Sequence, residues 1–139
     1  MKYLLIISCL LLTFVGCSKT VDTYDLDKRD GLYYQKFTDV PFTGNVTGEE
    51  QGKISKGKRE GKWLLYYEDG KLNEKGNYKD GKKEGEWLEY YRNGRIETKT
   101  NYKEGKLDGE WLYYTPSGRL KSKSNYKDGE HLGGRQYIR

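Results

Sequence analysis

Side chains suited to catalysis are scarce in this sequence. His131 is its only histidine, and no serine, cysteine or carboxylate stands around it at a spacing typical of a Ser/His/Asp or Cys/His site. A metal site would also need further ligands at suitable spacing. We therefore expect a protein that is not an enzyme and has no cofactor and no metal site, with His131 as a turn residue.

Acidic residues precede glycines at regular intervals, as in Asp80-Gly81, Glu104-Gly105 and Asp128-Gly129. Asp-Gly turns bind Ca²⁺ in some solenoids, but the nonapeptide spacing of those proteins is absent here. The glycines also form no phosphate-binding string such as GxGxxG. We expect both residue types to shape turns.

The two cysteines, Cys9 and Cys17, suggest attachment of lipid. An apolar run over residues 3–14 follows Lys2 and ends at a small residue, Gly16, which is the build of a secretory signal. The run is shorter than the ~20 residues that a membrane-spanning helix needs. The stretch "FVGC" resembles the lipobox of bacterial lipoproteins, in which the cysteine is diacylated on sulfur and becomes the new N-terminus. The alternative is an ordinary signal peptide cut nearby, with Cys17 left free.

The resemblance implies that residues 1–16 are a signal peptide and that Cys17 carries the lipid. Several acyl chains, at ~0.8 kcal/mol per buried CH₂, anchor a protein stably. Residues 18–30 are polar and aperiodic, so we expect residues 17–30 to be a lipidated N-terminus and flexible tether. The predicted location is the cell membrane or the outer membrane, with the lipid as the contact to the bilayer.

The charge pattern argues against a nucleic-acid partner. Lysine and arginine outnumber aspartate and glutamate by 26 to 21, which gives a net charge of +5. The two signs alternate along the chain instead of forming blocks. We expect a mixed, solvated surface and no nucleic-acid binding.

A 24-residue period organises the chain, since Trp63, Trp87 and Trp111 share this spacing with Gly57, Gly81, Gly105 and Gly129. A fixed period of this size is typical of repeat architectures. We expect a repeat domain over residues 31–139, with full units at about 57–81, 81–105 and 105–129. Residues 41–57 look like a shortened unit. Residues 129–139 look like a capping half-unit, with Arg135 where a tryptophan would stand.

Each unit has the pattern strand, tight turn, strand, turn, with aromatic and branched residues between glycines. Pro116 fixes its own φ at about −65°, which excludes a type I′ turn at Pro116-Ser117-Gly118. We predict a type I turn that ends in a left-handed glycine, which gives a three-residue hairpin loop with a G1 bulge.

Alternation along the first strand of each unit separates two faces. Leu64, Leu88 and Leu112 share one face with Tyr66, Tyr90 and Tyr114. The tryptophans lie on the other face, beside a variable position that holds Leu65, Glu89 or Tyr113. We expect the tryptophans to form the core between repeats, and leave open whether the aromatic rows are core or binding surface.

The recurring motif N-Y-K-[DE]-G-K-x-[ED]-G-E-W-L, at residues 77–88 and 101–112, resembles the MORN-repeat variant family of bacteria. The resemblance implies an all-β fold, an elongated single-layer antiparallel sheet of repeated β-hairpins. It also implies a binding or scaffolding role without naming a partner. Members are also catalogued as antitoxin components, a role that fits poorly with a lipoprotein signal.

Tyrosine and tryptophan are favoured at recognition surfaces, and a single-layer sheet cannot bury both of its faces. The candidate contact residues lie at or beside the variable positions and are Tyr67, Glu89, Tyr91 and Tyr113. We expect an exported, non-catalytic scaffold at the bacterial cell envelope that binds a protein. The alternative is a lipoprotein whose aromatic rows stack on a carbohydrate or envelope polymer.

Overall fold

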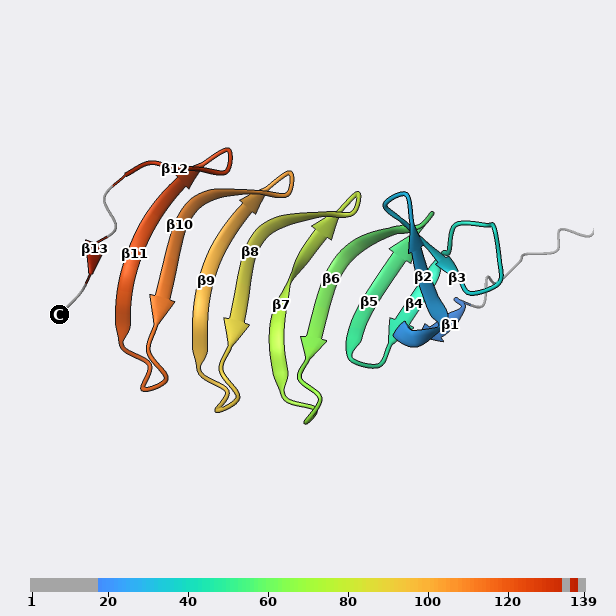
Figure 1. Cartoon of the computed structure of the whole chain (residues 1–139), viewed down its shortest axis with the longest axis horizontal. Helices are drawn as coiled ribbons and strands as arrows, with labels where there is room; N and C mark the ends of the chain where they lie inside the picture. Colours follow the sequence, from blue (N-terminus) through green and yellow to red (C-terminus); the bar gives the residue numbers. More distant parts are fainter. Residues whose placement is uncertain (1–17, 134–135, 138–139) are drawn as a thin grey trace, which may run out of the picture.

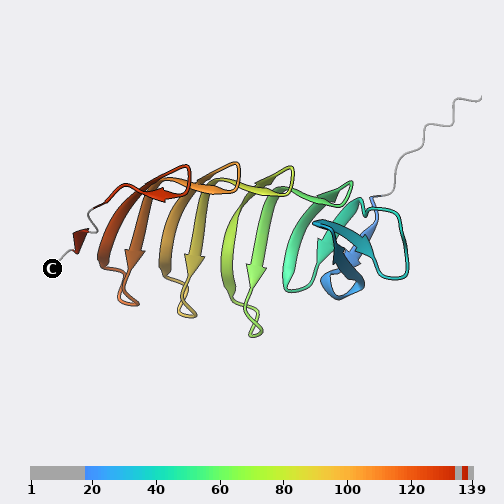
Figure 2. The same cartoon turned by 45° about the horizontal axis from the view of Figure 1, so that its top comes forward.

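The computed structural model describes residues 18–133 and 136–137. Most of this part of the chain is β-strand, and successive hairpins form one long sheet (Figure 1). Figure 2 shows the same sheet, turned, as a single curved layer. The predicted single-layer antiparallel sheet of hairpins is therefore confirmed, whereas the predicted signal peptide and Cys17 lie outside the described residues.

The long sheet has the order β1-β4-β5-β6-β7-β8-β9-β10-β11-β12, with β13 also paired to β11. Its strands are β1 (Thr20–Asp22), β4 (Gly44–Thr47), β5 (Glu50–Ser55), β6 (Lys58–Tyr66), β7 (Leu72–Lys79), β8 (Lys82–Tyr90), β9 (Ile96–Lys103), β10 (Lys106–Tyr114), β11 (Leu120–Lys127), β12 (Glu130–His131) and β13 (Gln136–Tyr137). A 3-10 turn, η1 (Thr23–Asp25), leads to a separate hairpin of β2 (Leu26–Arg29) and β3 (Leu32–Gln35).

The hairpin loops at one edge of the sheet have the predicted geometry. In the loop between β6 and β7, the Gly70 N–H donates to the Tyr67 carbonyl at 2.8 Å, and the Tyr67 N–H donates to the Lys71 carbonyl at 2.8 Å. Gly70 has φ +78°, the left-handed conformation that glycine adopts without steric cost. The three-residue loop with a left-handed glycine is thereby confirmed.

The opposite edge carries two-residue turns in which both central residues have positive φ, such as Asp80 (51°) and Gly81 (79°). This is the type I′ turn, whose twist matches that of the flanking strands. A carboxylate of the preceding repeat supports the turn, because Glu60 Oε2 accepts the Asp80 N–H at 2.9 Å. Glu84 does the same for Glu104 at 2.8 Å. The acidic residue of the motif therefore supports the turn that leads from its own repeat to the next.

The first strand of each repeat is distorted at a glycine. In β8, Lys75 of β7 faces Leu88 and Asn77 faces Glu84, so residues 85–87 lie opposite Gly76 alone. Gly85, at the start of this bulge, has φ +70°. Such a bulge increases the local twist and turns the tryptophan that follows toward the neighbouring strand.

Trp87 lies directly over Gly76 of β7. A Cβ atom on Gly76 would stand 2.2 Å from Cδ2 of Trp87, and a Cβ on Gly52 would stand 2.4 Å from Cδ2 of Trp63. Both indoles are only 1% exposed. A glycine one strand earlier is therefore the condition for burying each of these tryptophans in a sheet that has no second layer.

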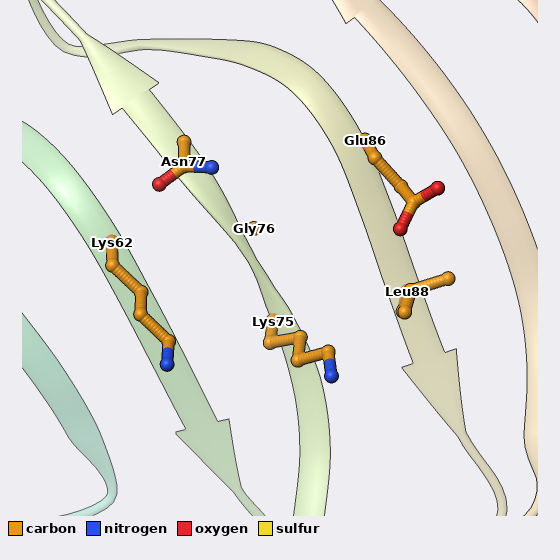
Figure 3. Close-up of a pocket in the computed structure, with 6 residues that line it drawn as sticks. All are labelled: Lys62, Lys75, Gly76, Asn77, Glu86 and Leu88. Atoms are coloured by element: carbon orange, nitrogen blue, oxygen red, sulfur yellow. The ribbon is translucent and has the colours of Figure 1, made fainter.

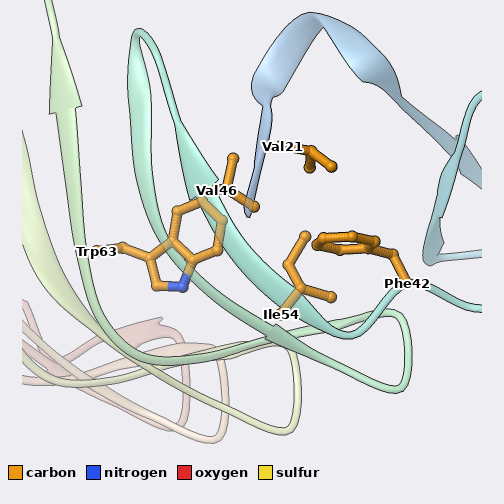
Figure 4. Packing of buried hydrophobic residues seen from close by; sticks show 5 residues of the cluster. All are labelled: Val21, Phe42, Val46, Ile54 and Trp63. Atoms are coloured by element: carbon orange, nitrogen blue, oxygen red, sulfur yellow. The ribbon is translucent and has the colours of Figure 1, made fainter. Parts of the chain in front are cut away.

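The N-terminal end of the sheet is covered by a hydrophobic cluster that contains Val21, Phe42, Val46, Ile54 and Trp63 (Figure 4). Val21 belongs to β1, which pairs in parallel with β4. The expectation of a flexible tether over residues 17–30 is thus wrong for residues 20–29, which form β1, η1 and β2. Burial of Val21 and the hydrogen bonds of the parallel pair hold this segment on the sheet.

The C-terminal half-unit adds β12 and β13 to the edge of β11, as a cap would. His131 lies in β12 and pairs with Tyr126, so its expected place in a turn is wrong. Arg135, at the tryptophan position of this half-unit, lies outside the described residues.

Replacing Gly76 with alanine tests the close approach of Trp87. The added methyl group overlaps the indole and forces it off the strand, and we expect a loss of about 1–3 kcal/mol in the free energy of unfolding. Urea denaturation followed by tryptophan fluorescence measures this loss. Ser124→Ala is the matched control at the equivalent repeat position, where a Cβ is already present. A Gly76→Ala variant as stable as Ser124→Ala would contradict the proposed packing.

Candidate binding surface

The sheet face that carries Trp63, Trp87 and Trp111, called here the Trp face, holds a ladder of aromatic rings. Tyr78 stands edge-to-face between two tryptophans, with its ring centroid 6.0 Å from Trp63 and 5.0 Å from Trp87. Trp87 in turn meets Tyr102 at 6.3 Å in the same geometry. Edge-to-face pairs are favoured by the ring quadrupoles, so the ladder links one repeat to the next.

An ion pair covers the ladder at each of its two tryptophans. The Arg59 guanidinium lies 4.4 Å from the ring centroid of Trp63 and pairs with Glu50. Lys83 Nζ lies 3.9 Å from the ring centroid of Trp87 and pairs with Glu74. These cations stack on the ring faces, so the Trp face of the first two repeats is closed by charged side chains.

The third repeat lacks each part of this arrangement. Thr100 stands where Gly52 and Gly76 stand in the earlier units, and Leu107 replaces the cation. Trp111 pairs in register with Thr100, and the bulge of β10 shifts to residues 108–110. Thr100 has a Cβ where Gly52 and Gly76 have none, so the strand before Trp111 lacks the space in which Trp63 and Trp87 lie.

Trp111 is only half-buried and lies parallel to Tyr113, with ring centroids 5.8 Å apart and an interplanar angle of 10°. The expectation that the tryptophans form the core is therefore confirmed for Trp63 and Trp87, whereas Trp111 is only partly buried. The sequence contains this difference, because the equivalent position on the strand before each tryptophan is glycine at 52 and 76 and threonine at 100.

Three of the four predicted contact residues gather around this ring pair. Thr98 of β9 lies between Glu89 and Tyr113 in the strand register, and its hydroxyl donates to Glu89 Oε2 at 2.8 Å. The Tyr91 hydroxyl lies 3.2 Å from that of Tyr113. Loss of hydration, followed by this hydrogen bond, raises the pKa of Tyr91 above the ordinary tyrosine value.

Tyr67 lies one repeat away from this group and joins the hairpins. Its hydroxyl donates to the Tyr90 carbonyl at 2.6 Å, and the Tyr91 hydroxyl donates to the Tyr114 carbonyl at 2.7 Å. The equivalent residue of the third repeat is Thr115, whose hydroxyl bonds within its own loop, to the Arg119 N–H at 3.1 Å. Tyr67 and Tyr91 thus have structural bonds, and their contact with a partner stays a prediction.

The sequence model of the family described as "MORN repeat variant" matches residues 59–80, 83–104 and 107–128. The chain carries three MORN repeats. The matched stretches coincide with the hairpins β6–β7, β8–β9 and β10–β11. No curated protein matches the chain.

Other kinds of site find little support in the MORN repeats and their flanks. Over residues 18–133 and 136–137, no group of three or more His, Cys, Asp or Glu side chains is placed to hold a metal ion. No helix in that part of the chain has the length and apolar character needed to cross a membrane. The candidate site is the partly exposed group of Glu89, Tyr91, Trp111 and Tyr113, in the second and third MORN repeats.

Replacing Thr100 with glycine tests why Trp111 is displaced. Removal of the side chain opens the strand beneath the indole, and we expect Trp111 to dock as Trp87 does. Iodide quenching of tryptophan fluorescence should then fall, because Trp63 and Trp87 are already buried. Thr98→Gly, on the same strand and face, is the control for the cost of glycine in a strand. Unchanged quenching in Thr100→Gly would contradict the role given to this residue.

Proposed function

We propose that this MORN-repeat protein is a lipid-anchored, non-catalytic interaction module that binds a protein partner through Trp111 and Tyr113. MORN repeats are commonly protein or membrane interaction modules, which fits a repeat chain of this kind. The observation that carries the proposal is the partial exposure of Trp111, whose ring lies parallel to that of Tyr113. Charged residues close the same face over Trp63 and Trp87.

The chemistry around Trp111 supports a protein partner. Half-exposed tryptophan and tyrosine contribute most to binding when a partner removes them from water. Thr98, Thr100, Ser122 and Ser124 face the ring pair in the strand register. Lys121 Nζ lies 5.6 Å from the ring centroid of Tyr113, so a partner there meets an aromatic pair with one cation beside it. Glu89 supplies a carboxylate at the margin, where polar groups of an interface stand.

The place of the third repeat in the array fits a tethered protein. Strand β1 and the third repeat, β10–β11, lie toward opposite ends of the long axis (Figure 1). A lipid on Cys17 would hold the N-terminal end at a bilayer, and the sheet would act as a spacer that presents Trp111 away from it. Export, lipid attachment and a location at the bacterial envelope are parts of this proposal.

A photo-cross-linking residue placed at position 113 tests the binding surface in intact cells. We expect one defined protein adduct from position 113 and none from position 125, an exposed site on the opposite face of the same repeat. Trp111→Ala should weaken the interaction about 30-fold, as expected for the loss of about 2 kcal/mol at an interface hot spot. Equal adducts from positions 113 and 125 would contradict the proposal.

A carbohydrate partner is the second candidate, since sugar rings stack on aromatic side chains such as Trp111 and Tyr113. The cross-linking experiment in intact cells also distinguishes a protein partner from a carbohydrate partner. A protein adduct that depends on Trp111 supports the first candidate. Quenching of Trp111 fluorescence by envelope glycans, without any protein adduct, supports the second.

Substitution of Cys17 tests the anchor. Cys17→Ala should abolish fatty-acid labelling and leave an uncut precursor, because the thiol is the acceptor of the lipid. Gel mobility and radiolabelled palmitate measure both effects. Cys9→Ala is the control, since Cys9 lies inside the predicted signal peptide. Labelling that persists in Cys17→Ala would remove the lipid from the proposal.

A further inference from the structure

The face opposite the Trp face, called here the Leu face because it carries Leu64, Leu88 and Leu112, has a repeated ion pair. Lys99 Nζ lies 2.5 Å from Glu86 Oε2 in the second repeat. Lys123 pairs with Glu110 in the same way in the third. Each pair joins the two strands of one hairpin and leaves that part of the Leu face electrically neutral.

The first repeat breaks this pattern. Lys62 stands at the position of Glu86 and Glu110, and Lys75 stands at the position of Lys99. Within the described part of the chain, neither ammonium group forms an ion pair or hydrogen bond. Lys75 Nζ instead lies 5.5 Å from the ring centroid of Tyr90. Two positive charges therefore replace a neutral pair, without a counter-charge of their own.

A hollow of about 210 Å³ lies beside these two lysines. Its lining residues come from β6, β7 and β8 and are Lys62, Lys75, Gly76, Asn77, Glu86 and Leu88. In Figure 3 both ammonium groups lie at one end of the group, and the Glu86 carboxylate lies away from that end. Because Glu86 is paired with Lys99, its charge is already balanced on the far side of the hollow.

We propose that Lys62 and Lys75 bind a phosphate group on the Leu face. A doubly charged phosphate balances two ammonium groups, and its several oxygens can accept a hydrogen bond from each. The open hollow admits an ion of this size from solvent. This site is on the other face from Trp111 and is independent of the proposed function.

The repeat itself supplies the matched variants. Lys62→Glu installs the residue type that the second and third repeats carry, so the variant should fold at least as stably, and its new carboxylate should pair with Lys75. Glu110→Lys does the reverse, and should create a second site beside Lys123 in the third repeat. The first change removes the site, and the second copies it to another place.

Titration of the whole protein with inorganic phosphate, followed by NMR of the lysine ammonium and backbone signals, tests the proposal. We expect saturable shifts at Lys62 and Lys75 that sodium chloride of equal ionic strength does not reproduce. The shifts should vanish in Lys62→Glu, and new shifts should arise around Lys123 in Glu110→Lys. Shifts that follow ionic strength alone, or that persist in Lys62→Glu, would overturn the site.

Sedimentation with vesicles that contain an anionic phospholipid identifies the source of the phosphate. Once the titration has shown the site, sedimentation of the wild type but not of Lys62→Glu assigns it to a lipid headgroup. Absence of sedimentation assigns it to a phosphate group outside the bilayer. Thermal unfolding of each variant verifies that the sheet is intact.

Discussion

The structure depends on the contact between a tryptophan and a strand residue that has no Cβ. A single-layer sheet has no second layer to cover its apolar face, so an indole that is fully buried on it must lie flat on the strand before it. Gly52 and Gly76 provide that space, and burial of one indole contributes at most about 4–6 kcal/mol by its area. Docking on the glycines fixes the positions of Trp63 and Trp87. Tyr78 can then contact both rings edge-to-face, and a cation can lie over each ring.

The repeat and the hairpins could be predicted because their determinants are local. Glycines at a fixed period mark the reversals, and Pro116 alone is sufficient to choose the loop type. The different burial of Trp111 could also be predicted from the sequence, but the residue that decides it is Thr100. This residue stands about eleven positions earlier in the chain, on the neighbouring strand. Treating Gly76 and Thr100 as equally small residues hides the difference, because a single Cβ decides whether the indole fits.

Other features could not be predicted because their partners are remote. Residues 20–22 have no strand pattern of their own, and they become β1 by pairing in parallel with β4, about 25 residues later. Tyr67 and Tyr91 occupy positions that suggest a free surface, and only the packing of successive hairpins shows that their hydroxyls reach the next repeat. Alternation of residue types along a strand predicts on which face of the sheet a side chain lies. It does not predict which atoms of other strands that side chain contacts.

Tyr67, Tyr91 and Thr115 set how an array of this type can change its length. Each tyrosine reaches forward to a carbonyl of the following hairpin, whereas Thr115 turns back into its own loop. A copy of the first unit brings its own tyrosine, Tyr67, and its own glycine, Gly76, so it can be inserted before the second unit. A hairpin added after β11 would meet neither a tyrosine nor a glycine at the equivalent positions of the third unit. Duplication can therefore lengthen this protein by inserting units inside the array. The third unit remains the last one, because no further hairpin can dock after it in this way.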